Sequence, residues 1–181
     1  TLSNSIAGAS NVVSTISAGN NTFSNFDVAS SDRGVLISAA GNAVTVKNVD
    51  IFLAGAGTTG VELFSSNTAI TLMDVDVHGG STGLISDSND AANIINVDAN
   101  SSIVNTTGNA VLVASDGSTL NFAGDINETD GVGGGVFVTN SFGTQTFSGL
   151  ITANTGTSAG ISVITNPGTT NFTGGLNIDT T

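Results

Sequence analysis

Residues 43–51, AVTVKNVDI, recur along the chain in degenerate copies, and this recurrence decides the fold class. In each copy an apolar residue is followed, usually three positions later, by a second apolar residue and then by a short β-like tail. The other copies are NTFSNFDV (21–28), AITLMDVDV (69–77), ANIINVDA (92–99), STLNFAGDI (118–126), GTQTFSGLI (143–151) and TTNFTGGLNI (169–178). Internal repetition of this kind is typical of solenoids, in which each unit packs on its neighbours.

A second recurring feature sets the length of the repeat. A small residue followed by alternating apolar residues precedes each core segment, at Gly34, Gly60, Gly83, Ala110, Gly135 and Gly160. The intervals between these positions are 26, 23, 27, 25 and 25 residues. The apolar runs are short, rich in β-branched residues and separated by Gly and Asn, which favours strands over helices. We therefore predict an all-β fold, a parallel β-solenoid of about seven coils of 23–27 residues with three short strands each.

One coil illustrates the expected arrangement. Its strands would be residues 35–37, 44–46 and 49–51, and a loop at 52–59 would lead to the next coil. The whole chain, 1–181, is expected to form a single solenoid domain. Within it, residues 21–178 hold the repeats.

The start of the chain is less regular than the rest. Residues 1–20 repeat less clearly and are expected to complete the first coil. The chain begins at Thr1 without a signal peptide, so we expect a mature product or an excised segment.

A corner is predicted where the alternation of side chains breaks. The step of three from Val46 to Val49 places this corner at Lys47 and Asn48. The second corner position is Asn, Asp or Gly in all seven copies, at Asn25, Asn48, Asp74, Asn96, Gly124, Gly149 and Gly174. These residues adopt a left-handed backbone at the least cost. We therefore predict a corner ladder that runs along one edge of the solenoid.

The second strand is predicted to carry two rows of side chains on opposite faces. The outward, polar row is Thr22, Thr45, Thr71, Asn93, Asn121, Thr146 and Asn171. The inward, apolar row is Phe23, Val46, Leu72, Ile94, Phe122, Phe147 and Phe172. Coils would be about 4.8 Å apart, so that the polar groups can form hydrogen bonds along the stack.

These features resemble a known family. Short coils with a two-residue corner of stacked Asn are similar to the right-handed parallel β-helix of the pectin-lyase-like superfamily. Copies rich in Gly, Asn and Thr, such as NPGTTNFTGGLNIDT (166–180), resemble repeats of large bacterial surface proteins, autotransporter passengers and adhesins. The resemblance, with the general preference for right-handed parallel crossovers, implies a right-handed solenoid.

Composition excludes several classes of partner and favours export. Fourteen acidic residues stand against Arg33 and Lys47, for a net charge of −12, so we expect no binding to nucleic acid. No apolar run approaches the roughly 18–20 residues of a helical span, so we expect no membrane insertion. A chain without cysteine and poor in lysine suits secretion in an unfolded state. The expected location is extracellular or on the bacterial cell surface.

The acidic residues of the third strand form a candidate metal site. Asp27, Asp50, Asp76 and Asp98 follow the second apolar residue of each corner unit, and the alternation directs them outward. Carboxylates stacked about 5 Å apart repel one another, which raises their pKa values or recruits a cation. Two interpretations stay open, a calcium-binding stripe and a solvated acidic face. Calcium is the one cofactor that the sequence suggests.

The sequence offers no convincing catalytic residues. The outward row of the first strand is Leu36, Glu62, Ile85, Leu112, Phe137 and Ser162. A glycosidase needs two carboxylates about 5–10 Å apart, and Glu62 has no evident partner. Arg33 lies in the preceding loop, and His78, the only histidine, stands in a glycine-rich loop. We therefore predict a protein that is not an enzyme.

Four apolar members of this outward row form a candidate contact stripe, at Leu36, Ile85, Leu112 and Phe137. A contiguous exposed apolar stripe usually marks a contact surface. Two interpretations stay open: association with a neighbour, or coverage by the loops at 52–59, 78–82 and 127–134.

The expected function is that of a non-enzymatic extracellular structural or adhesive solenoid. It would be a segment of a surface protein or a filament subunit. Its partners would be other copies of itself, head-to-tail or lateral, or another surface protein. The alternatives are a pectin-lyase-like carbohydrate-active or carbohydrate-binding module, and an ice-binding face on the Thr/Asn row.

Overall fold

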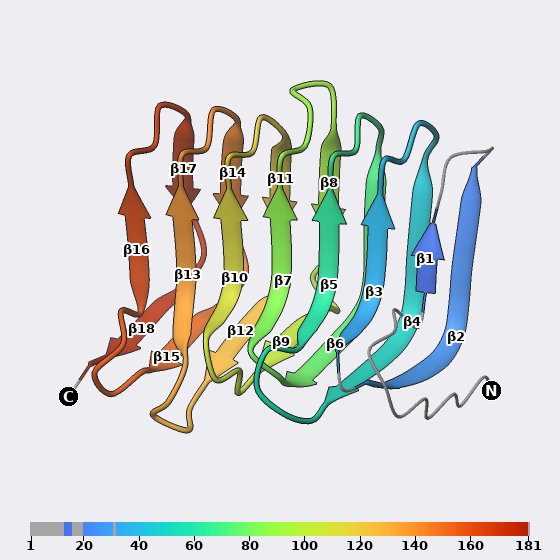
Figure 1. Cartoon of the computed structure of the whole chain (residues 1–181). Coiled ribbons are helices and arrows are strands. Elements are labelled where there is room, and N and C mark those ends of the chain that lie inside the picture. Colours follow the sequence, from blue (N-terminus) through green and yellow to red (C-terminus); the bar gives the residue numbers. More distant parts are fainter. Residues whose placement is uncertain (1–12, 16–19, 31, 181) are drawn as a thin grey trace.

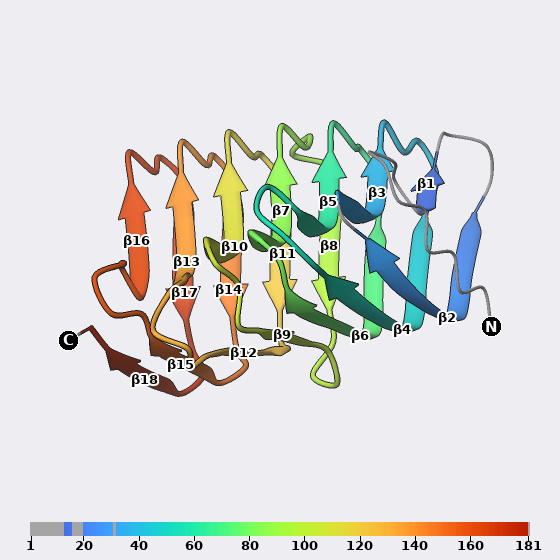
Figure 2. The same ribbon diagram turned by 60° about the horizontal axis from the view of Figure 1, so that its bottom comes forward.

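The computed structural model describes residues 13–15, 20–30 and 32–180, and these form a parallel β-solenoid (Figures 1 and 2). The fold has about six turns rather than the predicted seven, because seven copies of the repeat are separated by six periods. The chain rises in one sheet, crosses over and descends behind it while advancing away from the N-terminal end, so the winding is right-handed. None of the described residues is helical, and no helix capable of spanning a membrane occurs among them. The irregular first coil predicted for residues 1–20 falls almost entirely outside the described residues.

The described strands belong to two parallel sheets. The seven-stranded sheet contains β1 (Val13–Thr15), β3 (Arg33–Ser38), β5 (Thr59–Phe64), β7 (Thr82–Asp87), β10 (Asn109–Ala114), β13 (Gly134–Thr139) and β16 (Ile161–Ile164). The eleven-stranded sheet contains β2 (Asn21–Ser30), β4 (Val44–Leu53), β6 (Ile70–Gly79), β8 (Ile94–Val97), β9 (Ser102–Val104), β11 (Thr119–Phe122), β12 (Asp125–Glu128), β14 (Thr144–Phe147), β15 (Ile151–Asn154), β17 (Thr169–Phe172) and β18 (Leu176–Asp179). The second sheet bends, so that each coil has three faces (Figure 2).

The first strand of each coil stacks in the predicted register. Val35 pairs with Val61, Val61 with Leu84, and the series continues through later coils to β16. The small residue before each of these positions lies against the third strand. A Cβ atom on Gly34 would lie 2.6 Å from Ile51, and one on Gly60 would lie 2.5 Å from Val77. The residues at this position are small because a larger side chain would collide with the buried residues of that strand. We call them the small row: Gly34, Gly60, Gly83, Ala110, Gly135 and Gly160.

The second and third strands are continuous in the first three coils, where two short strands were predicted. β2, β4 and β6 each run for ten residues through the corner. Their corner residues have left-handed backbones, with φ of 59° at Asn25, 52° at Asn48 and 55° at Asp74. One left-handed residue therefore bends the strand without ending it, as in a β-bulge. From β8 onward the corner separates two short strands.

The inward row of the second strand fills the core, with one correction. Leu72 pairs with Val97, not with Ile94, whose side chain is 47% exposed. Burial of Ile95 and Val97 fixes this register, because a shift of one residue would exchange buried and exposed faces. At the C-terminal end the row becomes a stack of phenylalanines, with ring centroids 5.8 Å apart for Phe122–Phe147 and 5.2 Å for Phe147–Phe172.

A further row of left-handed residues follows the first strand and was not predicted. Its members have φ between 47° and 54°, and they are Ala39, Ser65, Ser88, Ser115, Asn140 and Thr165. Each lies five positions after a residue of the small row. The conformation turns the chain into the corner between the two sheets, where the next residue of each coil points inward.

Candidate functional surfaces

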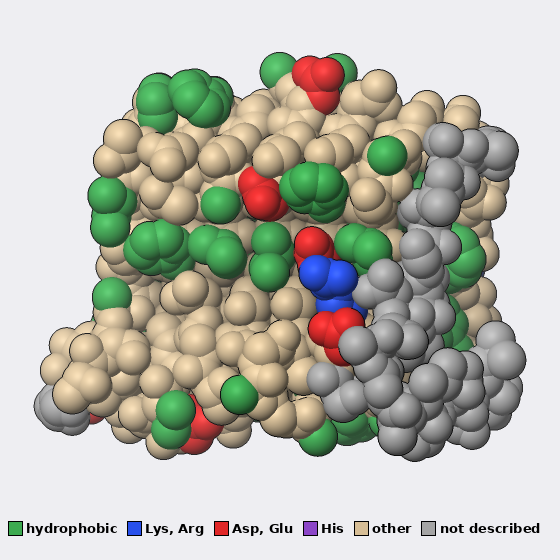
Figure 3. Space-filling view, in the orientation of Figure 1, with side chains coloured by type: hydrophobic (Ala, Val, Ile, Leu, Met, Phe, Trp, Pro, Cys, Tyr) green, Lys and Arg blue, Asp and Glu red, His purple; other side chains and the backbone are tan. Residues whose placement is uncertain are grey.

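The face of the seven-stranded sheet carries the predicted contact stripe. The residues of the stripe and those between them pair in one unbroken row, Leu36, Glu62, Ile85, Leu112, Phe137 and Ser162. All six side chains are half-buried. Figure 3 shows hydrophobic side chains in a line along this face, interrupted by charged groups. Arg33 forms an ion pair with Glu62, so the carboxylate once considered for catalysis is held by a structural contact.

An open hollow of about 320 Å³ lies beside this stripe. The residues that line it include Asn109, Gly134, Phe137, Ala159 and Ser162. Strands β10, β13 and β16, which build this part of the face, contain no ionisable residue. The surface there is uncharged, although the chain as a whole has a charge of −12.

The acidic row on the third strand is only partly as predicted. Asp27, Asp50 and Asp76 pair with one another in register. Asp98 lies in the corner of the fourth coil, where its Oδ1 accepts hydrogen bonds from the Asp74 N–H (2.9 Å) and the Ser101 hydroxyl (2.8 Å). Its expected place is taken by Ser102, whose hydroxyl donates to Asp76.

Asp125 continues the acidic row beyond Ser102. Its Oδ1 accepts a hydrogen bond from the N–H of Leu150 (2.9 Å). In the part of the chain that the structure describes, no three His, Cys, Asp or Glu side chains come together to hold a metal ion. The predicted calcium stripe has no such cluster, and calcium binding stays an untested prediction.

The corner ladder divides into two kinds of corner. In coils one to three the left-handed residue stands at Asn25, Asn48 and Asp74, and Asn48 Nδ2 donates to Asn25 Oδ1 (2.9 Å). The placement of Asn96 in this ladder is wrong: Asn96 belongs to β8, in register with Thr71 and Asn121. It therefore replaces Asn93 in the outward polar row, and Asn121 Nδ2 donates to its Oδ1 (3.0 Å).

Gly124, Gly149 and Gly174 line up, but for a reason other than the predicted one. None of the three has a left-handed φ. Instead, a Cβ on Gly149 would lie 1.9 Å from the carbonyl oxygen of Gly124, and one on Gly174 would lie 2.0 Å from that of Gly149. Two residues separate the strands at the Gly124 corner and three at the Gly149 and Gly174 corners, and glycine is needed because the backbones of successive coils approach closely.

A stacked aromatic pair lies on the third-strand face and was missed in the sequence. Phe52 and His78 pair across β4 and β6, with ring centroids 4.9 Å apart and planes inclined by 10°. Phe52 is 51% exposed. The lone histidine is therefore a surface residue that packs on an aromatic ring. The interval of 26 residues between the two, equal to one period, was the signal for this contact.

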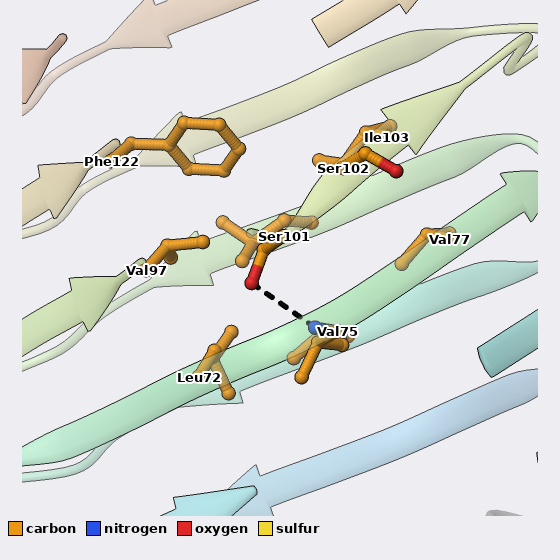
Figure 4. Close-up of a pocket in the computed structure, with 10 residues that line it drawn as sticks. Leu72, Val75, Val77, Val97, Ser101, Ser102, Ile103 and Phe122 are labelled. Carbon is orange, nitrogen blue, oxygen red and sulfur yellow. Dashed lines mark hydrogen bonds between the residues drawn. The ribbon is translucent and has the colours of Figure 1, made fainter. Parts of the chain in front are cut away.

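The core at the corner of the fourth coil has no room for a substrate. Figure 4 shows the core at the corner of the fourth coil, where Ser101 lies beside Val97 and points toward Val75, with Leu72 and Phe122 nearby. The cavity there has a volume of about 10 Å³, at the lower limit for one water molecule. Ser101 accepts a hydrogen bond from the Val75 N–H (3.1 Å), which satisfies the polar group that the longer corner brings inward. Any ligand of this part of the protein must therefore bind outside.

Two acidic residues are buried, and the sequence analysis did not predict this. Asp116 is fully buried, and its carboxylate accepts hydrogen bonds from the Ser86 hydroxyl, Asn89 Nδ2 (3.3 Å) and the Ser118 N–H (2.7 Å). We call these four residues the Asp116 network. Glu128, also fully buried, accepts a hydrogen bond from the Thr106 N–H (2.7 Å). Among the described residues, neither of these carboxylates forms an ion pair with Arg33 or Lys47, the two basic residues of the chain.

Comparison with known proteins gives no relative for this chain: no family model, no curated protein and no solved structure matches it.

Proposed function

We propose that this chain is a non-enzymatic, extracellular structural or adhesive rod of the bacterial cell surface. The architecture supports kinship with the pectin-lyase-like superfamily and with the repeats of surface proteins that resemble it. The rod would extend by end-to-end stacking of coils, with a second copy of the chain as the partner.

One observation carries this proposal. In the last described coil, inward side chains are exposed, with Val163 at 43% and Ile178 at 39%. The residues paired with them in the preceding coil, Val138 and Ala153, are 0% and 1% exposed because another coil covers them. An apolar end face with strand edges beside it is a template for a further parallel coil. A second copy offers coils of the same pattern, whereas a globular partner would leave the backbone groups of the edges unpaired.

The double variant Val163→Lys/Ile178→Lys is expected to abolish concentration-dependent assembly. Two ammonium groups placed between stacked coils would be desolvated without partners, so the dissociation constant should rise more than about 100-fold. Analytical ultracentrifugation and electron microscopy of the purified chain measure this directly.

Phe137→Lys is the matched control, because it places the same charge on the lateral stripe and leaves the end face intact. Assembly abolished by Phe137→Lys alone would replace end-to-end stacking with lateral association. Wild-type protein that is monomeric at high concentration would contradict the self-assembling rod.

A second candidate function, ice binding, is supported by the outward polar row of the second strand. With Asn96 in place of Asn93, the row runs in register as Thr22, Thr45, Thr71, Asn96, Asn121, Thr146 and Asn171. A second row, Thr119, Thr144 and Thr169, lies beside it two residues earlier along the strands. Strands β8, β11, β14 and β17 contain no ionisable residue. These hydroxyl and amide groups repeat about every 4.8 Å along the rod, as an ordered, uncharged surface.

If this face binds ice, Thr146→Tyr should remove most of the thermal hysteresis, because the larger ring interrupts both rows. Thr152→Tyr, the same change on the third-strand face, should leave thermal hysteresis unaltered. Absence of thermal hysteresis in the wild-type protein would dismiss this second function and leave the structural rod untouched.

A further inference from the structure

The turn between β12 and β13 is closed by a buried carboxyl group. Glu128 ends β12, and its side chain is fully buried. Glu128 Oε2 accepts the Thr106 N–H, while Glu128 Oε1 and Thr106 Oγ1 are both buried without a hydrogen-bond partner. A buried carboxylate with one N–H donor and no cation is unfavourable, whereas a neutral carboxyl group in the same place is tolerated.

Among the described residues, the strands around Glu128 provide no compensating charge. The strands packed against β12 are β9, β13 and β15, and none of them contains a titratable residue. The nearby charges come from its own segment: Asp130 on the turn, which repels a carboxylate, and Asp125, whose exposed side chain points away from the core. Burial raises the pKa of Glu128 from 4.5 to about 7; hydrogen bonding to Thr106 opposes the shift, and the charge of Asp130 adds to it.

The part of the structure that can respond is the turn itself. Residues 129–132 are exposed, and Gly131 has a left-handed φ of 75°. Gly133 lies so close to Thr106 that a Cβ on it would be 2.0 Å from the Thr106 carbonyl oxygen. A carboxylate at position 128 can reach water only if this turn moves away from Thr106. Figure 2 shows β12 between β9 and β15 on the face of the rod that bears these turns.

We propose that Glu128 and Thr106 form a pH-sensitive latch, which is closed while the Glu128 carboxyl group is protonated and opens when its proton passes to solvent. The closed state is favoured fully below the ordinary pKa of glutamate and is progressively lost as the pH rises through about 7. The inference does not depend on the function proposed above, because it concerns one turn of the solenoid in any assembly.

Hydrogen exchange of the full-length protein tests the latch. Corrected for intrinsic exchange, the protection of the Thr106 amide should fall roughly 100-fold between about pH 4.5 and about pH 8.5, since an opened glutamate has its ordinary pKa. In Glu128→Gln, which is neutral at every pH, the protection should not change. The same fall in Glu128→Gln and in the wild type would overturn the proposal, as would constant protection in the wild type.

Two further measurements keep the test decisive if Glu128→Gln does not fold. Glu62 and Glu128 are the only glutamates, so ¹³C-glutamate labelling gives two carboxyl signals. The Glu128 signal should titrate near pH 7, and in Asp130→Asn its midpoint should move to lower pH. Asp125→Asn, which removes an exposed charge from the same segment, should leave that midpoint nearly unchanged. A Glu128 midpoint near 4.5 in the wild type would refute the latch.

Discussion

Asp116→Ala is expected to destabilise the solenoid by roughly 3 kcal/mol or more. The carboxylate of the fully buried Asp116 accepts hydrogen bonds from Ser86, Asn89 and Ser118. Its removal leaves buried donors without acceptors, and each such donor costs about 1–3 kcal/mol. Asn89 Nδ2 also donates to the Ser86 hydroxyl (3.0 Å), so part of the Asp116 network can survive and the losses will not be fully additive.

Urea unfolding followed by circular dichroism measures this loss as a change of midpoint at constant slope. Asp90→Ala is the matched control, because Asp90 is exposed and lies on the equivalent corner of the preceding coil. It should change the stability by no more than about 0.5 kcal/mol. Equal effects of the two substitutions would mean that the Asp116 network contributes nothing beyond an ordinary surface aspartate.

Alternation within strands made much of the architecture predictable. The small row from Gly34 to Gly160 gave the correct register of the first strand, because each of its members from Gly34 to Gly135 directly precedes a buried apolar residue. The same logic placed Thr22, Thr45 and Thr71 in one outward row. Burial controls register strongly wherever one face of a strand is in the core, so a periodic sequence with clear alternation determines the stacking.

The error at Asn96 has a specific cause. The triplet Asn96-Val97-Asp98 has the same sequence as Asn48-Val49-Asp50, and for this reason Asn96 was predicted to lie at the corner. The fourth coil, however, has four residues between β8 and β9, whereas three separate Leu72 from Asp76. Where the corner changes length, a local motif no longer reports the register, and only the burial of Ile95 and Val97 does.

The buried polar groups at the corner were overlooked although a signal existed. Ser66, Asn89, Asp116 and Ser141 each lie six positions after a member of the small row. All four are at most 4% exposed. Short segments rich in Ser, Asn and Asp give no sign of burial in the sequence, because loops normally lie on the surface. The left-handed residue just before each of them turns the next side chain inward, and such a conformation is hard to predict for Ser or Thr.

Glu128 was missed for a related reason. It stands at an inward position of β12, paired with the buried Ala153, but the adjacent acidic and polar residues gave the segment the composition of a surface loop. A carboxyl group is rarely buried without a partner, so the alternation and the composition gave opposite predictions. Alternation was the correct guide.

Gly149→Ala is expected to destabilise the protein by about 3 kcal/mol, because the added methyl group has no space. Its carbon atom would lie 1.9 Å from the Gly124 oxygen and 2.7 Å from the Ala123 oxygen, both backbone atoms. Hydrogen bonds from Ser148 N–H to the Phe122 oxygen and from Thr173 N–H to the Phe147 oxygen, both 2.8 Å, hold the coils at this separation. The strain can be relieved only by spreading the coils, which lengthens these bonds and loosens the packing of the stacked phenylalanines.

Gly175→Ala is the control that separates this collision from the general effect of replacing glycine. A Cβ at Gly175 would meet only the end of the exposed Leu150 side chain, which can rotate away. Since alanine restricts the unfolded chain, this variant should be neutral or more stable by up to about 1 kcal/mol, so the two substitutions are expected to have opposite signs. Urea unfolding of both variants measures these two changes in the free energy of unfolding. Equal stabilities would show that the coils separate readily at this corner, and glycine at 124, 149 and 174 would then need an explanation other than close backbone approach.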